Sequence, residues 1–398
     1  MQDDPLKGDR GEGASLRHAL AFRAAADRNA ALMRLQEHLK EHPSDDLVAS
    51  LIVQAYGWSG HDQEAARALN TMLAPAGRDV LAGLEACLPG AMGMQGASVS
   101  TRYICFPNSM VQNLGFWSHT VTDRTGSARR VITKIMHEDH LGAEVTFYER
   151  IYPSHKGAAW LAPAPLAIER PEGTPIVLLT LEHIEGAVAD PGSMGSTEIS
   201  ALVNAYSSLG SVPIRSVAEV LPPPVTENGL SHGYLAKAMH AFHTPEGTRT
   251  TLAWVRSVVS SRGYRPEVIT AVGDAIEHWT SRNMHACIDP SFHYAFLHGD
   301  MHRHNVLLTG DRMVLIDWSR CTTGPKGLDL AVLLRRIGHQ RVMDLAIRHG
   351  VIDGKDMISA ALLSWALIIV SLELDLPPIK TEPLNHVFLP AADLICST

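Results

Sequence analysis

The chain of 398 residues is poor in cysteine, in charge and in long apolar runs, and each shortage excludes a class of protein. Its five cysteines are scattered and include no Cys-x-x-Cys pair, which argues against a disulfide framework and against a thiolate zinc site. Charged residues make up only 19% of the chain, too few for a largely disordered protein. We therefore expect a folded protein of a reducing compartment, the cytoplasm.

Further absences concern partners. No long run of Lys and Arg offsets the formal net charge of -8, which speaks against nucleic acid as the main partner. The polar residues 1–13 lack the apolar core of a signal peptide. The longest apolar stretch, 362–374, is interrupted by Ser364 and Glu373, and it is shorter than the roughly 20 residues that cross a bilayer. We expect it to form a buried helix, and we expect no membrane partner.

Hydrophobic patterning predicts three regions along the chain. Residues 1–95 are predicted to be helical, because apolar residues recur at three- and four-residue spacing. Residues 96–185 carry β-branched and aromatic segments separated by turn signals, which predicts a small antiparallel sheet interrupted by one helix. Residues 186–398 are mainly helical. The expected fold class is α+β. The strands are expected at 103–107, 115–123, 129–136 and 174–182.

Part of the helical region resembles a known repeat. Residues 42–75 are similar to one tetratricopeptide-type helical hairpin, with Pro43 before the first helix and Gly60 near the turn. Residues 30–43 resemble the second helix of a partial repeat. Fewer than three repeats do not bury a core of their own. We therefore expect these helices to pack on the rest of the protein or to bind a protein partner.

The most informative stretch is FLHGDMHRHNVLLTGDRMVLIDW, residues 296–318. It places Asp300 five residues before Asn305, and Asp317 twelve residues further on. The apolar segments around 306–308 and 314–316 predict a hairpin that brings Asn305 and Asp317 to the edge where Asp300 lies. Mg²⁺ prefers carboxylate and amide oxygens. The stretch therefore predicts one acid that is free to accept a hydroxyl proton and an oxygen pair that holds Mg²⁺.

Phosphoryl transfer requires this combination, because it depends on positioning and on neutralised phosphate charge. The protein-kinase catalytic loop has the same Asp-to-Asn spacing, although Gly299 here replaces its Arg. The His-Gly-Asp form at 298–300, the Ile-Asp-Trp form at 316–318 and the downstream GLDLAVLL at 327–334 resemble the aminoglycoside phosphotransferase and choline kinase superfamily. The resemblance implies a bilobal protein-kinase-like fold with its catalytic loop at 298–305.

The resemblance also implies roles for individual residues of this stretch. Asp300 is expected to be the catalytic residue that accepts or orients the proton of a substrate hydroxyl. Asn305 and Asp317 are expected to bind the metal, Mg²⁺. His298 and Asp329 are expected to organise the catalytic loop, with Asp329 bracing it from the downstream signature.

The resemblance implies nucleotide contacts upstream. Lys134 ends a predicted strand and is expected to bind the α- and β-phosphates of ATP. Glu144, in the following helix, is the expected partner of Lys134, and Glu149 is the second candidate. Adenine is expected at the backbone near Glu182 and Ile184.

The phosphate loop is a departure from the kinase pattern. No Gly-x-Gly-x-x-Gly is present, and the corresponding turn, 108–119, contains only Gly115. Its phosphate-binding residues are therefore not assigned. A zinc reading of His298, His302 and His304 is disfavoured, because these histidines lack the spacing of a zinc site.

Together these features predict an ATP-dependent phosphotransferase that acts on a hydroxyl of a small molecule, similar to an aminoglycoside, choline, a sugar or an amino alcohol. Three alternatives stay open. The chain is a kinase for a protein or glycan recruited by the N-terminal helices, a non-catalytic scaffold with a kinase fold, or a helical adaptor. The sequence decides neither the acceptor nor the choice between ATP and GTP.

Overall fold

The computed structural model describes residues 28–42, 46–58, 61–72, 80–104, 113–138, 143–155, 161–172, 176–221, 239–310, 312–374 and 385–398. The chain divides into two compact units. The first unit comprises Met1–Leu141 and Ala164–His183, and the second comprises Gly142–Pro163 and Ile184–Thr398.

The first unit contains an antiparallel sheet with the strand order β1-β2-β3-β5-β4. Its strands are β1 (Ser98–Ile104), β2 (Asn113–Thr122), β3 (Ala128–His137), β4 (Pro165–Glu169) and β5 (Ile176–Glu182). The prediction of a small antiparallel sheet is confirmed. The sequence analysis missed β4, because Pro163 and Pro165 at its start read as turn signals, although proline is tolerated as the first residue of a strand.

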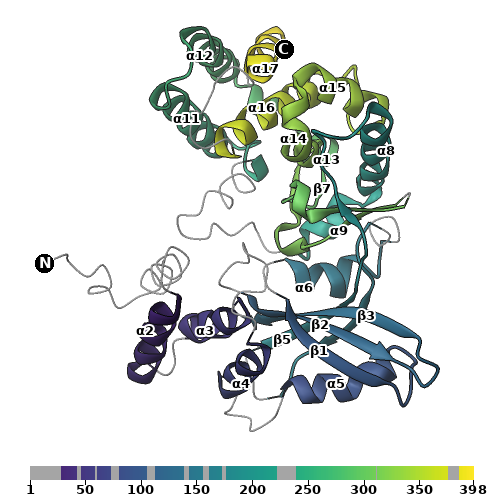
Figure 1. Ribbon diagram of the computed structural model, residues 1–398. Coiled ribbons are helices and arrows are strands. Elements are labelled where there is room, and N and C mark those ends of the chain that lie inside the picture. Colours follow the sequence, from purple (N-terminus) through teal and green to yellow (C-terminus); the bar gives the residue numbers. More distant parts are fainter. Residues whose placement is uncertain are drawn as a thin grey trace, which may run out of the picture. The chain divides into compact units, whose positions relative to one another are not determined.

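Helices cover one face of this sheet (Figure 1). Side chains alternate along a strand, so Trp117 of β2, Ile135 of β3 and Leu178 of β5 lie on the same face. They share a buried core with residues of the upstream helices, among them Val53 and Leu69. These helices are α2 (Arg28–Glu41), α3 (Asp46–Trp58), α4 (Asp62–Met72) and α5 (Val80–Ala91).

The expectation that the N-terminal helices pack on the rest of the protein is thereby confirmed. Leu84 and Leu88 of α5 pack with Val121 and Val131 of the sheet. Helices α3 and α4 form the expected hairpin, and α2 packs on α3 through Leu35. Since these helices and the sheet share one core, both fall in the first unit. The boundaries predicted at 95 and 185 stay a prediction.

The second unit is mainly helical, with two small sheets. One sheet pairs β7 with β10, and the other has the order β6-β8-β9. Its strands are β6 (Ala187–Val188), β7 (Tyr294–Leu297), β8 (Val306–Thr309), β9 (Arg312–Leu315) and β10 (Thr322–Pro325). Val306 pairs with Leu315, so the hairpin predicted from the apolar segments is confirmed.

The second unit begins with a short helix, α6 (Glu144–Thr146), which continues as a π-helical turn over Phe147–Ile151. Further short 3₁₀ turns lie in the loops and at helix ends, one of them at Arg303–Asn305. The remaining helices are α8 (Ser196–Ser207), α9 (Ile214–Ala218), α11 (Pro245–Ser261), α12 (Pro266–Ser281), α13 (Pro290–His293), α14 (Leu328–Leu334), α15 (His339–Arg348), α16 (Met357–Leu374) and α17 (Asn385–Ser397).

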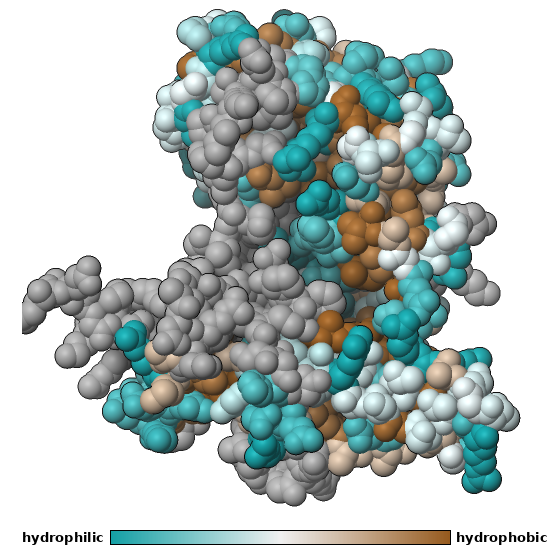
Figure 2. Space-filling model, in the orientation of Figure 1, coloured by the Kyte–Doolittle hydropathy of each residue, from teal (hydrophilic) through white to brown (hydrophobic). Residues whose placement is uncertain are grey.

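Helix α16 forms the centre of the second unit. By length and composition it is the one helix in the described part of the chain that could cross a membrane, yet 83% of its apolar window is buried inside the protein. Its Trp365 packs against Trp279 of α12 and against Phe242. Figure 2 shows hydrophilic residues on the outer helices of this unit, with hydrophobic residues between them. The prediction of a buried core helix is confirmed.

Candidate active site

A buried carboxylate braces the loop that follows β7. Asp329, near the start of α14, accepts the backbone N–H of His298 at 2.8 Å and that of Gly299 at 3.0 Å. The side chain of Tyr206 on α8 also hydrogen-bonds to Asp329. The carboxyl is fully buried. Its burial raises the pKa of Asp329 to about 7, and the two backbone N–H groups and Tyr206 act against that rise.

The buried side chain of His298 connects the loop that follows β7 to the hairpin of β8 and β9. Its Nδ1 accepts the backbone N–H of Asp300 at 3.3 Å, and its Nε2 lies 3.0 Å from the carbonyl oxygen of Ile316. These two partners require an imidazole with its proton on Nε2. Burial lowers the pKa of His298, which favours the same neutral form. His298 therefore connects the loop carrying Asp300 to the end of β9.

Gly299 permits a close approach that another residue would block. Its φ is +80°, and a Cβ at this position would overlap the carbonyl oxygen of Arg320. The left-handed conformation and the contact both require glycine. The Arg that protein kinases carry here therefore cannot occupy this position in the observed backbone. A different arginine lies beside the acid: Arg320 Nε is 3.9 Å from Asp300 Oδ2.

The side chain of Asp300 is partly exposed, with 23% of its surface open. Besides Arg320, its Oδ2 has His302 nearby, with Nε2 at 3.8 Å. Because its backbone N–H is held by His298 and its carbonyl oxygen accepts from Asn305 at 3.0 Å, the main chain is fixed on both sides of the side chain. A fixed, accessible carboxylate can receive a proton from a bound hydroxyl.

The end of the hairpin brings the two predicted metal ligands together. Asn305 precedes β8 and Asp317 follows β9, and the N–H of Ile316 donates to the carbonyl oxygen of Asn305 at 3.0 Å. Because the Asn305 amide nitrogen donates to the Asp300 carbonyl oxygen, its Oδ1 is the atom left to bind a metal. Asp317 has φ 63° and ψ 71°, a left-handed conformation that few residues other than glycine adopt.

Glu144 makes a contact that the sequence analysis did not foresee. Its buried Oε1 accepts the backbone N–H of Trp318 at 3.3 Å, directly after Asp317. The Trp318 ring is fully buried and stacks on Phe147, with centroids 4.1 Å apart and planes at 3°. Phe296 of β7 stacks near the same ring. The helix that carries Glu144 is thereby fastened to the segment that carries Asp317.

Lys134 lies in the first unit, on β3. It is buried, and it pairs in register with Phe116 of β2 and with Leu179 of β5. Its Nζ lies 5.5 Å from the centre of the Phe116 ring. By strand alternation its side chain lies on the face opposite to Ile135, hence opposite to the face that the N-terminal helices cover. Glu144 belongs to the second unit, so the pairing of Lys134 with Glu144, or with Glu149, stays a prediction.

The predicted adenine contacts lie where the first unit ends and the second begins. Glu182 is the last residue of β5, and its backbone N–H and its Oε1 both bond to the backbone of Ala164. The N–H of His183 donates to the carbonyl oxygen of Arg130. These two N–H groups are used within the first unit, and the adenine contact at the backbone near Glu182 and Ile184 stays a prediction.

The oxygen ligands at the end of the hairpin suit a hard cation that keeps several of its bound water molecules. Among the described residues, no group of three or more His, Cys, Asp and Glu side chains is placed to hold a metal ion. One carboxylate and one amide oxygen, from Asp317 and Asn305, suit Mg²⁺, which is usually held by one or two protein oxygens together with waters and substrate phosphates.

Two residues of the site were missed. Tyr206 and Arg320 carry no motif, and only the folded chain brings them to Asp329 and Asp300. Their positions offered little signal, since Tyr206 reads as one apolar position of an amphipathic helix. Arg320 follows Asp317 by three residues, and that proximity was the one available clue.

A braced loop presents one acid beside a hairpin end that presents an amide and a second acid, which is the arrangement predicted for a kinase-like phosphotransferase. The fold is α+β and protein-kinase-like, with an antiparallel sheet in one unit, a mainly helical second unit, and helices at the N-terminal side. The chain belongs to the phosphotransferase enzyme family, whose family model matches residues 111–361. No curated protein matches the chain.

Several solved structures are similar at low identity. Choline kinase from Cryptosporidium parvum is 13% identical, with 75% of this chain and 87% of that chain covered and a TM-score of 0.40. A thermostable mutant of aminoglycoside phosphotransferase APH(4)-Ia is 15% identical, with 79% and 98% covered and a TM-score of 0.41. A choline/ethanolamine kinase family protein from Mesorhizobium loti is 13% identical, with 79% and 94% covered and a TM-score of 0.40. At these values the likenesses decide neither nucleotide nor acceptor.

Proposed function

We propose that this protein transfers the γ-phosphate of Mg·ATP to a hydroxyl group of a small molecule. The observation that carries the proposal is the loop around Asp300, whose main chain is held by His298, Asn305 and, through Gly299, by Asp329. Membership of the phosphotransferase enzyme family supports the reaction class. Beyond the reaction class, we propose that ATP is the phosphate donor and that a small molecule is the acceptor.

In this proposal each residue has a distinct task. The acceptor oxygen attacks the γ-phosphorus, the bond to the bridging oxygen of ADP breaks, and the hydroxyl proton passes to Asp300 as the new bond forms. Asn305 and Asp317 hold Mg²⁺, which neutralises phosphate charge when it is bound. Lys134 binds the α- and β-phosphates, with Glu144 as its partner, and adenine binds near Glu182 and Ile184.

Arg320 supports the role of Asp300. A guanidinium at this distance attracts the carboxylate and limits its rotation, since both side chains are only partly exposed. The buried imidazole of His298 holds the same loop without adding a charge. In the proposal these contacts favour a defined position of Asp300, on which proximity-based catalysis depends.

The acceptor is proposed as a class. Hydroxyl compounds similar to aminoglycosides, choline, sugars or amino alcohols are the candidates. The purified full-length chain, Mg·ATP and a panel of such alcohols test the proposal, with ADP release as the first readout and phosphate on the acceptor as the second. We expect ADP release that depends on the acceptor for at least one compound of the panel.

A matched pair of variants shows whether Asp300 does the chemistry. Asp300→Asn removes the proton acceptor at nearly constant shape and should reduce turnover about 100-fold or more while ATP still binds. Asp274→Asn makes the same change at an exposed site on α12 and should leave turnover unchanged. An Asp300→Asn enzyme with normal transfer would overturn the assignment.

A kinase for a protein or glycan, recruited by the N-terminal helices, is the alternative. The molecule that carries the transferred phosphate distinguishes the two. The alternative predicts phosphate on a partner polypeptide or glycan, and the main proposal predicts it on the small alcohol. A non-catalytic scaffold would bind Mg·ATP without transferring phosphate to any acceptor of either kind.

A further inference from the structure

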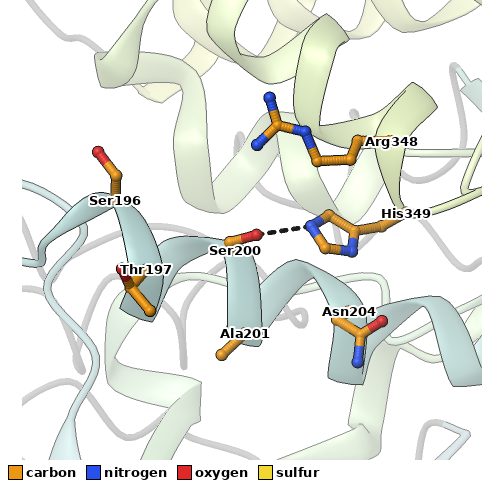
Figure 3. A pocket seen from close by; sticks show the side chains of 7 residues that line it. All are labelled: Ser196, Thr197, Ser200, Ala201, Asn204, Arg348 and His349. Carbon is orange, nitrogen blue, oxygen red and sulfur yellow. Dashed lines mark hydrogen bonds between the residues drawn. The ribbon is translucent and has the colours of Figure 1, made fainter.

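A hollow lies between α8 and the end of α15, in the second unit (Figure 3). Its volume is about 490 Å³. The residues that line it come from only two elements, α8 and the last turn of α15 with the residue after it. They are Ser196, Thr197, Ser200, Ala201, Asn204, Arg348 and His349.

The lining offers hydrogen-bond donors and positive charge. Arg348 carries a permanent positive charge and five N–H donors. The other ionisable group of the lining is His349, and no carboxylate belongs to the lining. Hydroxyl groups come from Ser196, Thr197 and Ser200 on α8. A hollow lined by an arginine and hydroxyl groups, with no carboxylate, suits an oxyanion better than a cation.

Two hydrogen bonds at the hollow hold its side chains in place and bring a second arginine to its edge. Arg341 Nη2 donates to Ser196 Oγ at 2.9 Å, so the Ser196 hydroxyl proton must point to another acceptor. Ser200 Oγ lies 2.8 Å from His349 Nε2, which holds both side chains in place (Figure 3). Arg341 and Arg348 are seven residues apart and therefore lie on one face of α15, toward α8.

Two carboxylates lie on the same helices, and each accepts a hydrogen bond outside the lining. Glu198 Oε2 accepts the backbone N–H of Gly195 at 2.7 Å, just before α8 begins. Asp344 Oδ1 accepts from Gln340 at 2.9 Å on α15. The positive charge of Arg348 and the hydroxyl groups of α8 therefore line the hollow without a carboxylate among them.

We propose that this hollow binds a small oxyanion, of the class of a phosphate group. The hollow is separate from the catalytic loop. Ser196, Ser200 and Asn204 follow one another at four-residue spacing on one side of α8, whereas Tyr206, which bonds Asp329, lies on the opposite side. The proposal therefore does not depend on the reaction that the chain catalyses.

Inorganic phosphate is the probe, titrated into the full-length chain by calorimetry in the presence of saturating Mg²⁺ and a non-hydrolysable ATP analogue. The analogue occupies the nucleotide site, so a remaining phosphate site is a different one. We expect millimolar binding in the wild type. Arg348→Gln should weaken it roughly tenfold or more, because a charge-assisted hydrogen bond is lost. Arg256→Gln, an exposed change on α11, should leave it unchanged.

A second variant guards against an effect on folding. Ser200→Asp places a negative charge in the hollow at similar volume and should abolish phosphate binding while the thermal unfolding temperature stays near that of the wild type. Phosphate binding that is equal in the wild type, Arg348→Gln and Ser200→Asp, or no binding in the wild type at millimolar phosphate, would overturn the proposal. Loss of phosphate binding with normal turnover, or the reverse, separates this site from the proposed function.

Discussion

The carboxylate of Asp329 accepts the backbone N–H of His298 at 2.8 Å, across a sequence separation of 31 residues. This bond fastens the loop that carries Asp300 to the start of α14. A second N–H, from Gly299, reaches the other oxygen of the same carboxylate. Several testable consequences concern this brace and the elements around it.

Asp329→Asn should destabilise the protein and slow the reaction. The amide keeps one oxygen but replaces the other by an NH₂ group, which would face the N–H of His298 or Gly299 without an acceptor. Leaving one buried donor unsatisfied costs about 1–3 kcal/mol. Chemical denaturation and steady-state kinetics measure the two effects. Tyr206→Phe, which removes a partner and keeps the carboxylate, should show the smaller loss in both, and equal losses would contradict the assigned brace.

Gly299→Ala should be far more damaging than a like change elsewhere. The new Cβ would overlap the carbonyl oxygen of Arg320, and the residue would also be held at positive φ. Gly310→Ala is the control, because Gly310 has φ +60° but no atom within 4 Å of the added Cβ. We expect about 1 kcal/mol for Gly310→Ala and several for Gly299→Ala. Thermal unfolding of both variants tests this, and similar losses would show that the contact with Arg320 is unimportant.

Arg320→Gln should lower kcat about tenfold or more and leave the KM for ATP nearly unchanged. The reason is that Arg320 faces Asp300 and therefore orients the acid during transfer. Arg312→Gln, at an exposed position of β9, is the matched control and should behave as the wild type. A rise in KM for ATP without a loss of kcat would instead place Arg320 in nucleotide binding.

His119 should make the first unit sensitive to acid. It is buried on the face of β2 that the helices cover, where its Nδ1 lies 2.7 Å from Thr101 Oγ1. Burial lowers the pKa of His119 from 6.5 to about 4. The folded state thus binds fewer protons than the unfolded state between these values. The contribution of neutral His119 to the free energy of unfolding is therefore fully present above pH 6.5 and is lost as the pH falls towards 4.

His119→Gln removes this titration and should flatten the dependence. The shift corresponds to at most about 3 kcal/mol. Denaturation of wild type and variant at a series of pH values measures it as a difference. That difference should shrink as the pH falls from 6.5 towards 4, and a constant difference would show that His119 titrates normally.

Removal of the N-terminal helices should make the remaining chain aggregate. A chain that begins at residue 96 would expose Trp117, Ile135 and Leu178, which the helices cover in the intact protein. Size-exclusion chromatography and binding of a hydrophobic dye, with the full chain as control, test this. A monodisperse shortened chain with low dye binding would favour the view of these helices as a separate docking module.

Local pattern predicted much of this molecule. The hairpin of β8 and β9 followed from two apolar segments around a glycine turn. The buried helix α16 followed from the apolar stretch at 362–374, although the helix itself begins earlier, at Met357, and is longer than that stretch. Asp300, Asn305 and Asp317 were singled out from their spacing along one short stretch, and the structure brings their backbones together at the end of the hairpin. Strand β4 was missed, because Pro163 before it and Pro165 at its first position are typical of turns when only neighbouring residues are considered.

Only the tertiary structure decided which residues hold that chemistry in place. Arg320 beside Asp300, Tyr206 on Asp329 and Glu144 on the backbone of Trp318 join positions that are far apart in sequence or carry no motif. The covering of the sheet by α3, α4 and α5 belongs to the same group. Sequence determines local conformation through neighbouring residues, whereas such contacts depend on where distant segments meet, and that is set by the packing of the whole core.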